Sequence, residues 1–405
     1  MNSRESLSSF NLSILWFGAA ISLAEILTGA MLAPLGVQNG LMAIVLGHLI
    51  GGALFYGAGR IGAELGKPAI ETTAISFGRF GMPFFAVLNI LQLTGWTAVM
   101  IINGAAAMSA VTQSWFGFES LSLFSILIAG LIALWILIGF QRMKWLNLIA
   151  VSSLFVISII LGVIAYSSQD ASMASGPLNG SEMPFGIALE LSVVMPLSWL
   201  PLASDYTRLS KNAHKGALFS AFGYFFGSVL MYAIGLGAAL FAGTSDITSI
   251  LIVAGLPVAA LVIVLFSTIT TTFLDVFSAA VSFNVLKQVN VKAVSMVVCA
   301  LGAALAVTVS VDYYEQFLYL IGSAFGPLFA ILLTDYFLLG RNRQCKKRIR
   351  VMNFVIWCIG VGIYRVLVLY PLPIGVSLPT MFSVMLIKVS IEKLNLMDRL
   401  GGQYE

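Results

Sequence analysis

Charged residues are scarce in this sequence. Asp, Glu, Lys and Arg make up 9% of its 405 residues, whereas 59% are hydrophobic. An ordinary soluble protein carries about 25% charged residues, so this deficit excludes a soluble fold. Apolar runs of about 20 residues recur along the chain, which is the length of a membrane-spanning helix and not of the short strands of a barrel. The composition predicts an all-α polytopic membrane protein.

Residue types that build catalytic and metal centres are scarce as well. The chain has two histidines, His48 and His214, and three cysteines, at positions 299, 345 and 358. The histidines share no metal-ligand spacing, and no H-E-x-x-H or G-x-S-x-G motif is present. An intramembrane enzyme is therefore disfavoured, no cofactor is expected, and the cysteines are interpreted as reduced structural residues.

The first apolar segment, about 12–35, is too long for the hydrophobic core of a signal peptide, so the chain is expected to insert through its own helices. The apolar runs predict twelve transmembrane helices. They lie at about 12–36, 41–62, 83–111, 121–140, 145–166, 184–204, 216–242, 251–276, 293–311, 316–339, 351–370 and 374–391.

Basic residues are missing from every second loop of this twelve-span arrangement. All 21 lysines and arginines except Arg365 lie at the termini or at the connections that follow the even-numbered spans, whereas the other loops carry acids such as Asp170 and Glu182. By the positive-inside rule, both termini are expected to be cytoplasmic. The basic loop 340–350 is interpreted as a topology anchor beside the phosphates of the lipid bilayer, and not as a nucleic-acid site.

Two spans carry residues that interrupt a membrane helix. The first contains Glu25, and a carboxylate at that depth costs at least ~2.5 kcal/mol on insertion scales. The sixth contains Pro196 and Pro201, which make a continuous helix unfavourable. If spans one to five and six to ten form inverted repeats, these breaks correspond, and paired breaks indicate a midplane binding site in a secondary transporter. Ordinary proline kinks are the alternative.

The eighth span contains a cluster of hydroxyl residues. Ser267, Thr270 and Thr271 share one helical face. With carbonyls released at a break in span one, they would form a set of hard oxygen ligands that suits Na⁺. The alternative is that each hydroxyl bonds back to its own helix.

Two tryptophans lie in the middle of apolar spans. Trp96, in the third span, follows a glycine and offers a flat wall for a planar ligand, and Trp199 lies between the two prolines of the sixth span. Stacking between them would hold an aromatic substrate, while ordinary packing is the alternative interpretation.

Short motifs along most of the chain, from Phe17 to about Tyr336, resemble the nucleobase:cation symporter-1 family, in particular its cytosine permease-like members. They are Thr28-Gly29, Gly95-Trp96, Ser204-Asp205-Tyr206-Thr207-Arg208 (similar to the family's D-F/Y-x-R signature), Thr270-Thr271, Gly326-Pro327 and Thr334-Asp335-Tyr336.

The resemblance implies a LeuT-like fold in a multi-pass protein of the bacterial plasma (inner) membrane. A cytoplasmic N-terminus (1–11) would precede two inverted five-helix repeats (12–166 and 184–339). The basic loop 340–350, two C-terminal helices (351–391) and a cytoplasmic tail (392–405) would follow. The resemblance also places the sodium site at the carbonyls of Gly18 and Ile21 with Ser267, Thr270 and Thr271. It places the substrate wall at Ser22, Ala24, Trp96, Ser198 and Thr272.

The chain departs from cytosine permease at two places. Glu25 stands where that protein has a small hydroxyl residue, and Thr272-Phe273 replace its Asn-Asp pair. The chain most resembles the short bacterial members proposed to carry the thiamine precursor 4-amino-5-hydroxymethyl-2-methylpyrimidine (hydroxymethylpyrimidine). We therefore expect a transporter that imports this pyrimidine by cation symport with alternating access. A permease for cytosine or another nucleobase is the alternative within the class, and a channel without coupled transport is the alternative outside it.

Glu25 is predicted to read the aminopyrimidine edge of the substrate, where an amino donor lies beside a ring nitrogen acceptor. A carboxyl group can form two parallel hydrogen bonds with that edge. Two other roles remain open at this point: proton coupling, with H⁺ in place of Na⁺, and capping of backbone amides released at the break.

Overall fold

The computed structural model describes residues 6–139, 144–167, 183–245, 249–250, 257–310, 313–341, 349–370 and 372–401, and the side chains of these residues apart from 144–148, 150, 257–267 and 395–401. The expected acidic loops around Asp170, Glu182 and Asp246, and most of the basic loop 340–350, lie outside the described residues.

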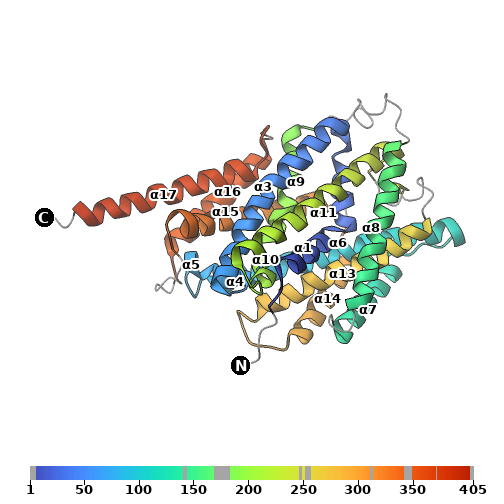
Figure 1. Ribbon diagram of the computed structural model, residues 1–405, viewed down its shortest axis with the longest axis horizontal. Coiled ribbons are helices and arrows are strands. Elements are labelled where there is room, and N and C mark those ends of the chain that lie inside the picture. The colour runs from blue at the N-terminus through green and yellow to red at the C-terminus, as the bar shows by residue number, and fades with distance from the viewer. Residues whose placement is uncertain are drawn as a thin grey trace.

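The described chain is almost entirely helical (Figure 1). The helices are α1 (Ser9–Ala20), α2 (Leu23–Met31), η1 (Ala33–Leu35), α3 (Gly36–Leu65), α4 (Ala69–Thr72), α5 (Ala74–Phe77), α6 (Met82–Phe116), α7 (Leu121–Ile138), α8 (Lys144–Ser167), α9 (Phe185–Ser198), α10 (Leu200–Thr207), α11 (Ala213–Ala242), α13 (Pro257–Phe283), α14 (Val291–Thr308), α15 (Tyr314–Leu333), η4 (Thr334–Leu338, a π-helix), α16 (Val351–Val368) and α17 (Ser377–Gly401).

All of the expected spans overlap helices of the structure. Among the described residues, eight helical stretches are by themselves long and apolar enough to cross a membrane. The all-helical membrane architecture is thus confirmed, while the count of twelve spans and the 5+5 repeat stay predictions. The last helix differs from its expected span because α17 continues to Gly401, and Figure 1 shows it projecting from the bundle toward the C-terminus.

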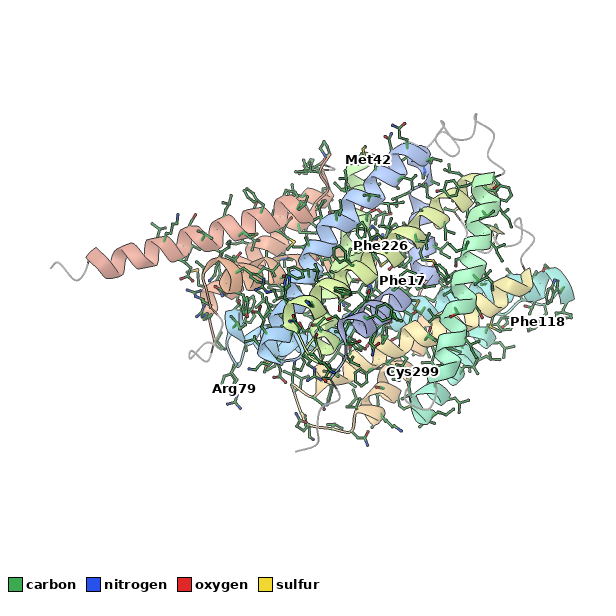
Figure 2. The ribbon with its side chains drawn as sticks, viewed as in Figure 1. Phe17, Met42, Arg79, Phe118, Phe226 and Cys299 are labelled. Carbon is green, nitrogen blue, oxygen red and sulfur yellow. The ribbon has the colours of Figure 1, made fainter. Side chains whose placement is uncertain are left out.

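Burial separates central helices from peripheral ones. In the most apolar window of α9 and α10, 89% of the residues are buried, against 22% in α14 and in α16. Large apolar side chains such as Phe226, which is 62% exposed, point outward from the bundle (Figure 2). In a bilayer these side chains face lipid, so the outer helices need no further protein cover.

Glycines bring the central helices close together. A methyl group at Gly223 of α11 would lie 2.2 Å from the carbonyl oxygen of Ser13 on α1, and one at Gly47 of α3 would lie 2.3 Å from Cβ of Ser192 on α9. Small residues of this kind allow close backbone approach between membrane helices. As a result, α11 packs directly on α1, α2 and α3, and polar side chains from these helices meet inside the bundle.

The stretch Ser204–Thr207 joins α10 to α3 and α4. The hydroxyls of Ser204 and Thr207 donate to the carbonyls of Ala58 (2.8 Å) and Gly59 (2.7 Å). Asp205 accepts the amide of Ala69 at 3.0 Å. The motif that resembles the family signature therefore holds the end of the broken sixth span against the second span.

A second buried network fixes the C-terminal helices. Asp335 of η4, whose side chain is fully buried, accepts from Arg341 at 2.6 Å and lies 3.3 Å from the Lys388 ammonium of α17. Glu392 pairs with both cations, at 2.7 Å and 2.8 Å. Hydrogen bonds from the Arg341 guanidinium lower the pKa of Glu392 to about 2, so this carboxylate is charged at any physiological pH. Arg350 also lies 3.9 Å from Asp335, so three cations surround the two acids, which is how a buried acid is tolerated here.

Glu190 of α9 has a structural role that the sequence did not indicate. Its carboxylate accepts from the hydroxyls of Tyr364 and Ser377, each at 2.6 Å, and from the amides of Val376 and Ser377, each at 2.7 Å. These amides lie at the start of α17, where a helix favours an anion. Glu190 therefore anchors the start of α17 and the middle of α16 to the sixth span.

Replacing Lys388 by Met should destabilise the protein by about 3 kcal/mol, because it removes the buried ammonium group that lies between Asp335 and Glu392. Thermal unfolding of purified protein in detergent measures this effect. The matched control is Lys393→Met, which removes an exposed lysine from the same helix. Equal shifts in the two variants would show that the buried network does not hold α17.

Candidate functional site

The first span is broken at Ile21 and Ser22, between α1 and α2. The amide of Ser22 donates to the carbonyl of Ala20 (2.8 Å) instead of that of Gly18 four residues earlier. The amide of Glu25 donates to the hydroxyl of Ser22 (3.4 Å) instead of the carbonyl of Ile21. Ser22 thus acts as a helix cap in the middle of the bundle. The carbonyls of Gly18 and Ile21 are released from these bonds of a continuous helix.

The sixth span is broken at Trp199, between α9 and α10. Pro201 has no amide hydrogen, and the amide of Leu202 donates to the carbonyl of Trp199 (3.1 Å) instead of that of Ser198. The side-chain amide of Gln92 on α6 donates to the carbonyl of Ser198 at 2.8 Å. The third span therefore supplies the hydrogen bond that the broken sixth span lacks.

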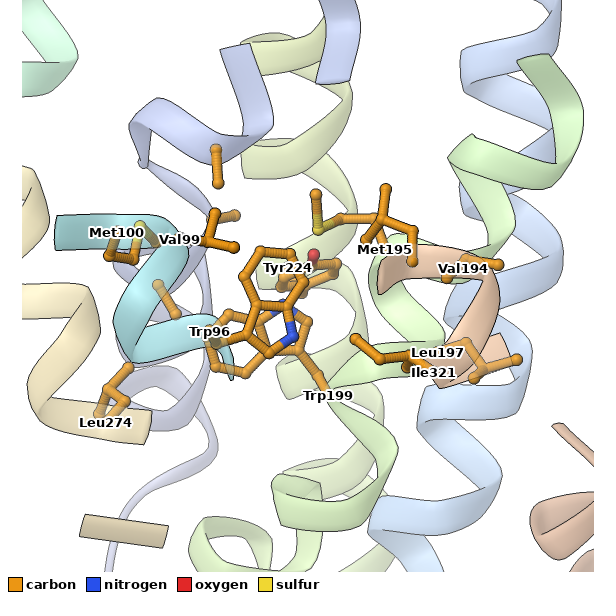
Figure 3. Close-up of a cluster of buried hydrophobic side chains, with 14 of the residues drawn as sticks. Trp96, Val99, Met100, Val194, Met195, Leu197, Trp199, Tyr224, Leu274 and Ile321 are labelled. Atoms are coloured by element: carbon orange, nitrogen blue, oxygen red, sulfur yellow. The ribbon is translucent and has the colours of Figure 1, made fainter. Parts of the chain in front are cut away.

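A central cavity lies where the two breaks meet α6 and α13. It is lined by Ser22, Ala24, Glu25, Leu93, Trp96, Met100, Met195, Ser198, Trp199, Leu202, Thr271 and Asp275. Figure 3 shows Trp96 and Trp199 entering this space from α6 and from the junction of α9 and α10, with Met100 and Met195 to either side. The indole N–H of Trp199 is buried and has no hydrogen-bond partner among the described residues, so it is a donor available to a ligand.

The central cavity is closed down in this structure. Its volume is about 10 Å³, which holds roughly one water molecule. A second cavity of about 470 Å³ is lined by Tyr314 and Phe317, among others, and by the exposed side chain of Arg365. The Trp96 ring packs edge-on against Tyr314 and Phe317, at centroid distances of 6.0 Å and 5.5 Å. These aromatic rings separate the two cavities.

Glu25 lines the cavity and also contacts α11. Its two carboxyl oxygens are hydrogen-bonded to the hydroxyls of Tyr224 and Ser228, each at 2.6 Å. Ser228 is in turn 2.5 Å from Nε2 of His48 on α3. The side chains of Glu25 and His48 are each about 1% exposed. Within the described residues, the carboxyl oxygens of Glu25 accept no hydrogen bond from a backbone amide. This disfavours a role for Glu25 in capping amides released at the break.

Six of the seven predicted substrate residues line this one cavity: Ser22, Ala24, Glu25, Trp96, Ser198 and Trp199. The seventh, Thr272, is fully buried but does not line it, whereas its neighbour Thr271 does. The structure thus brings most of the predicted wall together, and it places a different hydroxyl of span eight at the cavity.

The structure describes four of the five predicted sodium ligands. The break puts Gly18 and Ile21 at the end of α1, with Thr271 across the adjoining cavity. Thr270 is half-buried on α13, the helix that carries Thr271, and the side chain of Ser267 lies outside the described residues. Two released carbonyls and a buried hydroxyl are hard oxygen donors, the ligand type that Na⁺ binds, and the sodium site stays a prediction.

Sequence reasoning missed several residues of the site. Tyr224, Ser228 and His48 were given no role, although a histidine inside a span is a functional candidate by default. The sequence motifs assign no role to Asp275 either. The structure places Asp275 in the cavity wall, 3% exposed and without a hydrogen-bond or ion-pair partner in the described part of the chain.

Comparisons with known proteins identify a family and a fold. The family model described as "Permease for cytosine/purines, uracil, thiamine, allantoin" matches residues 2–355. The cytosine permease of Escherichia coli (strain K12) is 24% identical over 347 residues, which cover 84% of this chain and 81% of the permease.

Two solved transporters share the fold. Mhp1, described as a nucleobase-cation-symport-1 family transporter, matches in a closed conformation with bromovinylhydantoin bound (TM-score 0.79, 20% identity, 96% of this chain and 93% of that one). It also matches in an inward-facing conformation (TM-score 0.81, 18% identity, 97% and 92%). A Na⁺-coupled sialic acid symporter in an outward-open state matches with a TM-score of 0.65 at 15% identity, over 94% and 88% of the chains.

Replacing Gln92 by Leu should destabilise the protein by about 1–3 kcal/mol, because the buried carbonyl of Ser198 loses its donor. Thermal unfolding in detergent gives the shift. Gln113→Leu is the control, since Gln113 is exposed near the end of the same helix. If both variants unfold at the temperature of the unmodified protein, the bond from Gln92 does not support the break.

Proposed function

The chain belongs to the family of permeases for cytosine/purines, uracil, thiamine and allantoin, and we propose that it imports an aminopyrimidine by cation symport with alternating access. Hydroxymethylpyrimidine is the leading candidate, and cytosine is the second. The proposal also places the protein in a bacterial plasma membrane with both termini in the cytoplasm, by the distribution of its basic residues.

One observation carries the proposal: two tryptophans and two carboxyl groups meet at a cavity between two broken helices. Trp96 and Trp199 supply flat apolar faces for a planar ring, and base–aromatic stacking is worth ~1–3 kcal/mol per base. Glu25 and Asp275 supply acceptors for amino hydrogens. A planar ring that carries an amino group satisfies both requirements.

The two candidate substrates share the amino edge with which the carboxyl groups of the cavity can pair. Cytosine and hydroxymethylpyrimidine each carry an amino group beside a ring nitrogen, while uracil has an oxo group in place of the amino group. A site that pairs with the amino edge rejects a ligand that lacks it, because the buried acceptors are then left unpaired. The sequence departure from cytosine permease at Glu25, which lines the cavity, favours hydroxymethylpyrimidine over cytosine.

The size of the cavity supports alternating access. A pyrimidine ring does not fit into about 10 Å³, so the helices around the cavity must separate before a substrate enters. The two broken spans offer hinges for such a movement, because the junctions at Ser22 and Trp199 already lack continuous helical bonding.

Sodium is the proposed coupling ion. The carbonyls of Gly18 and Ile21 and the hydroxyls of Thr270 and Thr271 would hold it, and its charge would bind beside the substrate at the break in span one. The alternative coupling ion is H⁺.

A ligand panel tests the function. Purified protein is heated with cytosine, hydroxymethylpyrimidine, uracil and hypoxanthine, each with and without Na⁺. We expect stabilisation by the two aminopyrimidines, enhanced by Na⁺. Counterflow of the labelled ligand in proteoliposomes then distinguishes a carrier from a channel. Stabilisation by hypoxanthine alone would assign a purine and reject the proposal.

Glu25→Gln should weaken binding of cytosine and hydroxymethylpyrimidine by about tenfold or more, because it removes a charge-assisted hydrogen bond worth ~1.5–3 kcal/mol. Isothermal titration measures the affinity. Uracil is the control ligand, since its oxo group gains nothing from a carboxylate. An unchanged affinity for both aminopyrimidines would remove Glu25 from substrate recognition.

Thr271→Val should abolish the sodium dependence of uptake or stop uptake, because it keeps the shape of the side chain and removes an oxygen ligand. Thr97→Val is the matched control: Thr97 is also buried, but its hydroxyl bonds to its own helix at Leu93, 2.8 Å away. Uptake is measured in proteoliposomes over a range of Na⁺ concentrations. Equal transport by the unmodified protein in sodium-free buffer with an imposed proton gradient would show that the sodium site is misassigned.

A further inference from the structure

A chain of short hydrogen bonds leads from the cavity wall into the bundle. Glu25 Oε2 lies 2.6 Å from Ser228 Oγ, and Ser228 Oγ lies 2.5 Å from His48 Nε2. At the far end, His48 Nδ1 lies 2.8 Å from the carbonyl oxygen of Ile44. All three side chains are buried, and they come from α2, α11 and α3, which pack on one another.

The geometry fixes the number of protons in this chain. A carbonyl only accepts, so Nδ1 of His48 carries a hydrogen. The two remaining contacts, from Nε2 to Ser228 and from Ser228 to Glu25, need one hydrogen each. The serine hydroxyl supplies one of them. The second is either on Glu25 as a carboxylic acid or on Nε2 of an imidazolium.

The two arrangements differ only in where one proton is located. In the first, the Glu25 acid donates to Ser228, and Ser228 donates to neutral His48. In the second, imidazolium donates to Ser228, and Ser228 donates to the carboxylate. Moving the Glu25 proton to Ser228 while the serine proton passes to Nε2 converts one into the other. Atoms and charge balance, and the pair has no net charge in either form.

We propose that Glu25, Ser228 and His48 form a binding site for a single proton, which is loaded and released through the central cavity and carried with the substrate. Without this proton, a carboxylate and a neutral imidazole would share one serine hydrogen. One of the two short contacts of Ser228 would then bring two lone pairs together with no hydrogen between them. Glu25 and His48 together would also hold an uncompensated negative charge.

Closure of the cavity links the proton to transport. A net charge in a closed, water-excluded site is far more costly than a neutral pair. The closed state therefore binds the proton more tightly than an open one, and a substrate that promotes closure promotes proton uptake with it. This link, though not the proton site itself, rests on the proposed function.

Aromatic and acidic side chains surround the hydrogen-bonded chain of Glu25, Ser228 and His48. The side chains that face this chain from α11 are Tyr224 and Tyr232. Asp275 of α13 lies across the cavity, and Tyr314 of α15 contacts α2 through a hydrogen bond with Thr28. Trp96 of α6 and Ser198 of α9 are not titratable at physiological pH. Among the described residues, no lysine or arginine lines the cavity or bonds to these side chains. The extra proton is thus the balancing positive charge on the side of Glu25 that faces α11 and α3, whereas the proposed sodium site lies at the end of α1.

The proton site is tested without substrate by ¹⁵N NMR of the imidazoles. His214 is the only other histidine in the sequence, so the variant His214→Gln leaves His48 as a single signal. We expect Nδ1 to be protonated, and the titration of His48 to shift when Ser228→Ala interrupts the chain. An unprotonated Nδ1, or a titration that Ser228→Ala leaves unchanged, would overturn the proposal.

Proton transport is tested in proteoliposomes that contain a pH-sensitive dye, with equal Na⁺ on both sides and a clamped membrane potential. Addition of cytosine or hydroxymethylpyrimidine should acidify the lumen, and Ser228→Ala should lose this acidification. Ser220→Ala is the control, because Ser220 is buried on the same helix and bonds only to Gly216 of that helix, at 2.7 Å. It should retain the signal.

The outcomes separate the two proposals. Substrate entry without acidification in the unmodified protein, or with the same acidification in Ser228→Ala, overturns the proton proposal. If neither pyrimidine enters, the proposed function fails, and the ¹⁵N titration still decides whether the proton site exists.

Discussion

The need to satisfy every backbone amide and carbonyl away from water governs this structure. A helix meets that need by itself, so a break inside the membrane requires replacement partners. Side chains supply them here: the Ser22 hydroxyl caps α2, and the Gln92 amide reaches the carbonyl of Ser198. The replacement is partial, because the carbonyls of Gly18 and Ile21 are released at the break that borders the cavity. The buried indole N–H of Trp199, at the second break, also has no partner among the described residues.

The buried acids show how differently one kind of group can be accommodated. Glu190 accepts four hydrogen bonds and anchors a helix, and Asp335 is neutralised by Arg341 and Lys388. Glu25 bonds to two hydroxyls, while Asp275 faces the cavity without a partner among the described residues. Of these four acids, Glu190 and Asp335 serve the fold, while Glu25 and Asp275 line the cavity with acceptor capacity left over.

The sequence predicted local features better than contacts between helices. Glu25 and the prolines at 196 and 201 located both breaks, because covalent geometry and the cost of a buried charge act within a single span. Which hydroxyl of span eight faces the cavity depends on the rotation of α13. Neighbouring residues differ by about 100° around a helix, so the choice between Thr271 and Thr272 needed the packed structure. The partners of Glu25 were hidden for the same reason: Tyr224, Ser228 and His48 lie on two other helices, and close packing at glycines brings them together.

The small volume of the central cavity also limits what this closed conformation can carry across the membrane. A carrier that returned with a wide aqueous pocket would transfer many waters and dissolved ions in each empty cycle, and so would dissipate the gradients that drive it. A pocket that shrinks to the volume of about one water allows no such leak. Met100 and Met195, which lie on either side of the tryptophans, are flexible enough to fill the space that a departing ring leaves. Tight closure of the central cavity thus conserves the ion gradients across the membrane.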